Sequence, residues 1–280
     1  MQATEYHLYR YFLINNRQVS IMDITREEIE KKFLEIFKNK KIKHNKNDKD
    51  YILYPIDNYD NKLFICKLSK ETKITLHKEG EKDIDTDEES DYPYVYIIIN
   101  TENQIILIQK NTSVFKDTFR AKNYLSEILE NFVREYNYSI TIDSIADKEQ
   151  FWTAVIKSKK LYSLNLKLSA PNLFGARVKA NEFMKKQKEE YNLSHLEVNM
   201  NNPEGNLYLS KENLDDFIEY ATEGGGNYNL VYEDENNVKR TIDSKNTNKK
   251  ILLSSEITKE DYNFIIAEMR RIDNLSGLNG

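Results

Sequence analysis

Alternation of apolar and polar residues is clearest over residues 161–170, where leucines alternate with serine, asparagine and lysine. A period of two predicts a strand with one buried face and one face in water. Pro171 ends this strand, and residues 173–191 change to helical spacing. A second alternating stretch, residues 195–200, predicts another strand. The sequence therefore predicts a β-α-β unit over residues 161–201.

The first half of the chain shows both periods. Apolar residues at three- and four-residue steps predict helices over residues 25–39 and 114–136, the first of them opened by a capping box. β-prone residues predict a strand over residues 5–14 and a hairpin over residues 51–68. The hairpin expected over residues 94–109 is apolar at nearly every position, so we expect it to be buried on both faces.

Between the hairpins expected at 51–68 and 94–109, the periodicity of apolar residues is less clear. Residues 73–77 are β-prone and could extend a sheet. Residues 79–91, EGEKDIDTDEESD, have few apolar side chains with which to fold. Their composition predicts a mobile loop.

The second half mixes strands and helices in the same way. The expected elements are a strand at 138–142, a helix capped by Asp147, a helix capped by Ser210 and ending at Gly224–Gly226, a hairpin over 227–242, a strand at 251–253 and a final helix opened by Thr258.

Together these elements predict an α+β fold with mixed or antiparallel sheets and helices packed on one side. We expect two subdomains, residues 1–137 and residues 138–273, followed by a frayed tail at 274–280. No linker rich in proline, glycine or serine marks the boundary, so one continuous core is the alternative.

Composition narrows the class of protein. Hydrophobic residues make up 39% of the chain and no apolar run is long enough to cross a membrane, so we expect a protein without a membrane partner. The first residues lack the pattern of a signal peptide, which predicts a cytoplasmic location. The single cysteine, Cys66, lies in an alternating strand and is expected to be a buried hydrophobic residue. Neither a metal site nor a cofactor is predicted.

Two turns have the geometry that ligand sites use. Gly225 and Asn227 belong to a glycine-rich turn, and Asn172 follows the strand that Pro171 ends. Backbone N–H groups at such turns can bind anions. However, the glycines follow a helix and precede a strand, which is the reverse of a phosphate loop. The alternative interpretations are a helix C-cap at the glycines and a helix N-cap at Asn172.

Basic residues give a second candidate. Arg177, Lys185, Lys186 and Lys188 lie on the predicted helix 173–191. If this helix and the basic clusters at residues 38–46, 157–160 and 270–271 converge, they form a groove that follows phosphates. The alternative is a solvated helix face, and the net charge of −5 disfavours general coating of nucleic acid.

Four segments follow one another over residues 94–243: YVYIIINTENQIILIQ, the long helix after it, LNLKLSAPN before a helix, and YATEGGGNYNLVYED. In this order they resemble proteins of bacterial phage-defence and abortive-infection gene clusters. The resemblance implies a role in phage defence by sensing, nucleic-acid contact or partner contact. It carries over no catalytic residue.

The sequence thus predicts a binding component of a bacterial anti-phage system that contacts nucleic acid or a phage-derived ligand. One alternative is an adaptor that binds a protein from the same operon or a second copy of itself, because tyrosines are abundant and suit an interface. Another is a metal-dependent nuclease with a degenerate site near Asp57.

Overall fold

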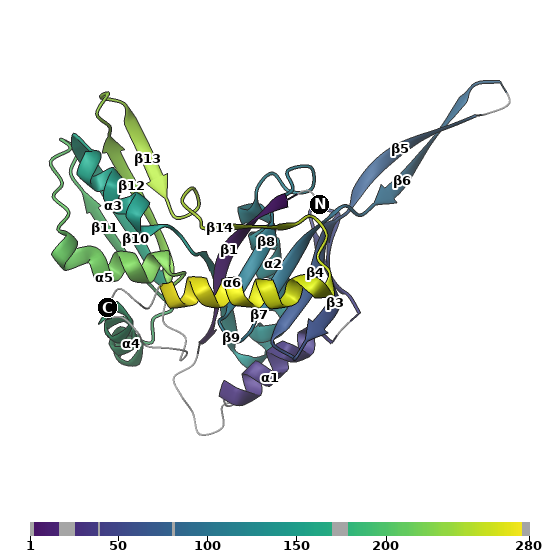
Figure 1. Ribbon diagram of the computed structural model, residues 1–280, viewed down its shortest axis with the longest axis horizontal. Helices are drawn as coiled ribbons and strands as arrows, with labels where there is room; N and C mark the ends of the chain where they lie inside the picture. Colours follow the sequence, from purple (N-terminus) through teal and green to yellow (C-terminus); the bar gives the residue numbers. More distant parts are fainter. Residues whose placement is uncertain (1–2, 17–25, 39, 80–81, 170–178, 276–280) are drawn as a thin grey trace.

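The computed structural model describes residues 3–16, 26–38, 40–79, 82–169 and 179–275. Within these residues the chain forms six α-helices, two short 3-10 helices and fourteen strands arranged in three sheets (Figure 1). Every pair of neighbouring strands is antiparallel. The predicted α+β class is confirmed.

The large sheet contains eight strands and curls into a half-barrel. Its order is β14-β1-β8-β7-β4-β3-β2, and β9 also pairs with β1. These strands are β1 Ala3–Asn15, β2 Ile42–Lys46, β3 Lys49–Tyr59, β4 Leu63–Lys70, β7 Tyr94–Asn100, β8 Ile105–Gln109, β9 Tyr138–Ser144 and β14 Lys250–Ser254.

β1 organises this sheet because it is long enough to have three partners. Along one edge its first residues pair with β14 and its last residues pair with β9, while β8 pairs along the other edge. The two hairpins predicted for the first half, β3-β4 and β7-β8, are confirmed. Every residue of β8 is buried, as the apolar sequence predicts.

Helices cover both faces of the large sheet, whereas the sequence suggested one side. α1, Arg26–Ile36, and α2, Thr118–Val133, pack on one face of the sheet and share a hydrophobic core with it. α6, Tyr262–Leu275, packs through its apolar stripe on the opposite face (Figure 1). Both faces of β7 and β8 are apolar, so helices must shield each face of the sheet from water.

The small sheet has four strands in the order β11-β10-β12-β13. They are β10 Lys160–Ser169, β11 His195–Asn201, β12 Gly226–Glu233 and β13 Lys239–Asp243. The predicted β-α-β unit is present in the chain order, but β10 and β11 are antiparallel neighbours rather than parallel ones.

One face of the small sheet carries its core. The leucines of β10 point toward α3, Lys148–Lys157, and α5, Lys211–Thr222, as the alternation predicts. α4, Lys179–Tyr191, contributes the buried Met184. Asp147 caps α3 with its side chain as expected. Ser210 is the N-cap residue of α5, but its side chain makes no capping hydrogen bond.

The third sheet is a two-stranded ribbon formed by β5, Thr72–Glu79, and β6, Ile84–Asp91. We call it the arm. It projects away from the rest of the molecule (Figure 1). The prediction of a mobile loop over 79–91 is therefore wrong for residues 84–91, and residues 73–77 do not extend the large sheet. β6 pairs with the β-prone strand β5 although its own residues are mostly acidic.

Two strands from the second half of the sequence belong to the large sheet. β9 and β14 both pair with β1, and α6 packs on the same sheet. The expected boundary at residue 137 falls immediately before β9, so the sheets do not divide the chain in sequence order. Whether either half folds alone stays a prediction.

Two further expectations concern membrane-spanning segments and the thiol. No helix in the described part of the chain is long and apolar enough to cross a membrane. Cys66 is fully buried in β4, and burial raises the pKa of its thiol. It behaves as a small core residue, as the sequence predicts.

Candidate functional site

The small sheet meets the large sheet at the predicted glycine-rich turn. We call this contact the junction. The Ala146 N–H donates to the Thr222 carbonyl at 2.7 Å, and Ile145 pairs with Glu223 as an isolated bridge. These backbone contacts join the residues that follow β9 to the C-terminal end of α5.

Several polar side chains converge at the junction from four strands. The Ser169 hydroxyl at the end of β10 donates to Asp143 Oδ2 at 3.1 Å, and Asn227 Nδ2 donates to Asp143 Oδ1 at 3.4 Å. His195 Nδ1 lies 3.5 Å from the Ser169 hydroxyl, and burial lowers the pKa of this imidazole. The structure thus brings the predicted residue Asn227 together with Asp143 and Ser169.

These residues do not form a catalytic triad. Ser169 is only 2% exposed, and its hydroxyl proton is directed at Asp143 rather than at a histidine base. The arrangement is a hydrogen-bonded clamp between β9 and the small sheet.

The glycines at the junction are required by close packing. Gly224 has φ +89°, a backbone conformation that favours glycine. A Cβ on Gly225 would lie 2.6 Å from the Tyr220 ring, and one on Gly226 would lie 2.2 Å from the Lys167 carbonyl oxygen. This agrees with the helix-end and turn interpretation. A ligand contact at Gly225 stays a prediction.

Arg10 is the main polar anchor of the junction, and the sequence did not single it out. Its guanidinium donates to the Glu223 carbonyl at 2.7 Å, to the Asn103 carbonyl at 3.2 Å and to Asp273 Oδ1 at 2.9 Å. One side chain of β1 therefore ties the small sheet and α6 to the large sheet. The available signal was a single arginine inside an apolar strand.

Glu223 is a half-buried acid beside this anchor. Its Oε1 atom is buried and has no hydrogen-bond partner within the described residues. Burial raises the pKa of the carboxyl to about 7, and the negative charges of Glu219 and Asp273 act in the same direction against Arg10 and Lys249. The junction therefore contains a group that titrates near neutral pH.

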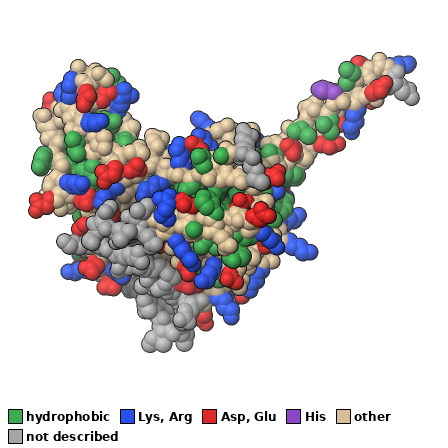
Figure 2. All heavy atoms as spheres, in the orientation of Figure 1, with side chains coloured by type: hydrophobic (Ala, Val, Ile, Leu, Met, Phe, Trp, Pro, Cys, Tyr) green, Lys and Arg blue, Asp and Glu red, His purple; other side chains and the backbone are tan. Residues whose placement is uncertain are grey.

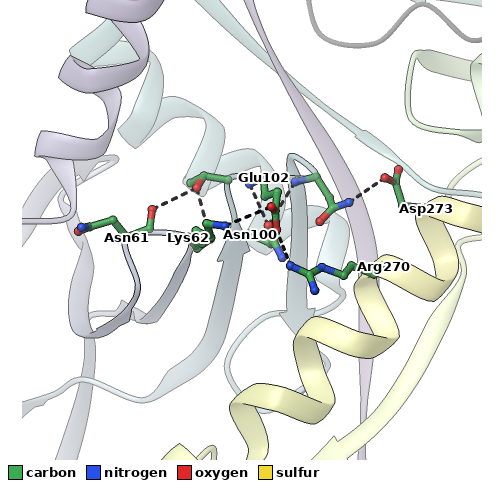
Figure 3. Close-up of polar contacts among 8 residues, drawn as sticks. Asn61, Lys62, Asn100, Glu102, Arg270 and Asp273 are labelled. Carbon is green, nitrogen blue, oxygen red and sulfur yellow. Dashed lines mark hydrogen bonds and ion pairs between the residues drawn. The ribbon is translucent and has the colours of Figure 1, made fainter.

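A second polar group attaches α6 to the loops of the large sheet. Glu102 accepts from Arg270 at 2.9 Å and from Lys62 at 3.3 Å, as Figure 3 shows. Arg270, and then Lys62, hold the pKa of Glu102 below its usual value. These residues line a cavity of about 210 Å³. Since both cations share one carboxylate, we interpret the contact as structural.

The basic helix α4 is less available than its sequence suggests. Lys186 is exposed and Lys185 is half-buried, but Lys188 Nζ donates to the Asn15 carbonyl at 2.9 Å and burial lowers its pKa. Asn172 and Arg177 lie outside the described residues. Nucleic-acid binding through α4 stays a prediction.

The other basic clusters are partly neutralised. Ion pairs join Lys43 to Asp50 and Lys46 to Glu127, and Arg271 pairs with its helix neighbour Glu268. No group of three or more His, Cys, Asp or Glu side chains that could hold a metal ion is found among the residues described.

Asp57, the residue named for the nuclease alternative, accepts from the Tyr262 hydroxyl at 2.9 Å and lies 3.8 Å from Lys259 Nζ. It links β3 to α6. These contacts give Asp57 a structural role.

The arm is the second candidate, and the sequence missed it. Its strands pair without interruption from Thr72 opposite Asp91 to Glu79 opposite Ile84. Among the residues that the structure describes, each of these strands has one partner only, so each presents an unpaired backbone edge. All eight residues of β6 are exposed. Figure 2 shows the arm standing clear of the body.

Comparison with known proteins identifies no relative: no protein family, no curated protein and no solved structure matches the chain.

Proposed function

We propose that this protein is a binding component that docks onto a partner protein through the arm. The single observation that carries the proposal is that the arm extends from the body with its side chains exposed. A ribbon of this kind buries too little apolar surface to be stable by its own packing.

An exposed ribbon also has open edges, which proteins usually shorten or cover. Here the edges run for eight residues on each strand, and the arm exposes Ile74 by 40% and Ile84 by 66%. At the base of the arm Tyr92 and Tyr94 are exposed as well. Tyrosine is enriched at protein interfaces, so the exposed tyrosines at the base of the arm add to the surface that a partner protein could bind.

The proposal corresponds to the adaptor alternative of the sequence analysis. The junction offers no exposed nucleophile, and Lys188 on α4 is directed into the protein. The phage-defence resemblance supplies the proposed setting, in which the arm would contact another component of the same system. Phage plating on cells with the intact gene cluster and with an arm-deleted copy would test that setting.

Deleting the arm should abolish partner binding and leave the body folded. Thr72 and Asp91 lie directly opposite each other, so an Asn-Gly turn can replace residues 73–90. We expect the free energy of unfolding to change by less than about 1 kcal/mol, because the arm adds nothing to the main cores. Urea unfolding measures this.

Partner binding is then measured directly. A photoreactive amino acid at the exposed Ile74 should crosslink one partner in cells that carry the neighbouring genes, whereas the same probe at the exposed Glu204 on the body should not. With the purified partner, calorimetry should show affinity for the arm-deleted protein reduced more than about 100-fold. Equal affinity for the two proteins would disprove the proposed function.

A further inference from the structure

The two faces of the arm differ in chemistry. Strand alternation places Asp85, Asp87, Glu89 and Asp91 on the same face of β6, and we call these four residues the acidic row. Neighbours in the row follow one another at about 6.8 Å, the spacing of alternate residues in an antiparallel strand. The row therefore presents regularly spaced carboxylates along the length of the ribbon.

The neighbouring strand adds apolar surface to that face. Ile74 lies opposite Glu89, and Leu76 lies opposite Asp87. Ile74 is exposed and Leu76 is half-buried. An apolar strip thus runs beside the acidic row, which suits side chains with an apolar stem and a cationic tip.

The charge of the arm is not balanced within it. Residues 72–91 contain eight acidic and three basic residues, a net charge of −5, which equals the net charge of the whole chain. Lys73 pairs with Glu88, and Lys78 pairs with Asp87 and lies 3.8 Å from Glu89. Two lysines cannot neutralise this many carboxylates, so the arm carries the excess negative charge of the protein.

We infer that the face of the arm with the acidic row docks onto a lysine- and arginine-rich surface of a different protein. This inference rests on the proposed function and specifies the partner. Lysine and arginine stems would cover Ile74 and Leu76, and their cationic groups would meet the acidic row.

A second copy of this chain fits the surface less well. Two arms brought together would place like charges face to face. The remainder of the chain has no net charge, and Lys43 and Lys46 of its basic clusters are already paired with acids. Charge complementarity therefore favours a different, cationic protein.

The test neutralises the acidic row without deleting the arm. The triple variant Asp85→Asn, Asp87→Asn, Glu89→Gln keeps side-chain size and leaves Asp91, which accepts from the Tyr92 N–H, unchanged. The matched control Glu189→Gln, Glu204→Gln, Glu235→Gln removes the same charge from exposed positions of the body. The probe is a fluorescent peptide of alternating lysine and valine, measured by anisotropy at low and at physiological ionic strength.

We expect the wild-type protein and the control to bind the peptide with similar affinity, weakening as salt rises. The triple variant should bind about tenfold more weakly or worse. Equal affinity of the triple variant and the control, or no binding of the peptide to the wild-type protein, would overturn the inference. A dimer of the wild-type chain that dissociates when the arm is removed would also overturn it, in favour of a second copy.

The crosslinked partner separates this inference from the proposed function. If that partner binds the triple variant as tightly as the wild type but fails to bind the arm-deleted protein, the proposed function stands and the cationic partner is wrong. If the partner binds all three proteins equally, the proposed function itself fails.

Discussion

Replacing Gly226 with alanine is expected to destabilise the protein by about 3 kcal/mol or more. The added Cβ would lie 2.2 Å from the Lys167 carbonyl oxygen and 2.9 Å from the Leu168 Cα. Both atoms belong to the backbone of β10, so no side chain can rotate away. β12 would have to separate from β10 at the Leu168–Gly226 pair, with loss of sheet hydrogen bonds.

Urea unfolding followed by circular dichroism measures this change, with Asn227→Ala as the control. The Asn227 side chain makes one long hydrogen bond, 3.4 Å to Asp143, so its loss should cost less than about 1 kcal/mol. If Gly226→Ala and Asn227→Ala unfold at the same urea concentration, the close approach of β12 to β10 described here is incorrect.

Replacing Glu223 with glutamine is expected to stabilise the protein at pH 8 and to leave its stability nearly unchanged at pH 4.5. In the folded protein the pKa of Glu223 is raised from 4.5 to about 7, chiefly by burial. Between these two values the folded state binds a proton that the unfolded state has released. Stability therefore falls as pH rises through this window, and the whole penalty is present above pH 7.

The penalty relieved by Glu223→Gln at pH 8 should be on the order of 2–3 kcal/mol. Because other groups also titrate, the quantity to measure is the difference in unfolding free energy between variant and wild type across this pH range. Glu235→Gln, at an exposed position, is the control and should shift stability by less than about 0.5 kcal/mol at every pH. A constant difference for Glu223→Gln would show that its carboxyl is not buried as described.

The spacing of apolar residues and the capping residues predicted most of the secondary structure, because each of these patterns depends on one helix or strand alone. The leucines of β10 alternate, and they are buried on one face. The apolar run of β8 is buried throughout. Asp147 lies before an amphipathic stretch and caps α3. None of these inferences depends on which strand lies next to which.

The missed features depend on contacts between distant residues. Glu223 follows a helix with a polar face and looks like a surface residue, but its carboxyl is largely withdrawn from water at the contact with Arg10 of β1. The arm was missed for another reason. Its composition resembles that of a disordered segment, and only the register with β5 makes residues 84–91 a strand.

The candidate site was only partly predictable. Asn227 was identified from its glycine-rich neighbourhood, and the structure places it beside Asp143. Lys188 was predicted to contact nucleic acid, with a solvated helix face as the alternative, yet its ammonium group reaches the carbonyl of Asn15. A helical repeat shows which residues share a face, but the neighbouring element determines which of them remain in solvent.

The three-way pairing of β1 also determines the order in which this molecule can fold. Ala3 pairs with Ser254, so β1 leaves the ribosome long before its partner β14. Contacts this distant in sequence carry a large loop-closure cost and are associated with slow folding. Until β14 arrives, part of one edge of β1 lacks its partner, and its apolar residues are open to aggregation or to a chaperone.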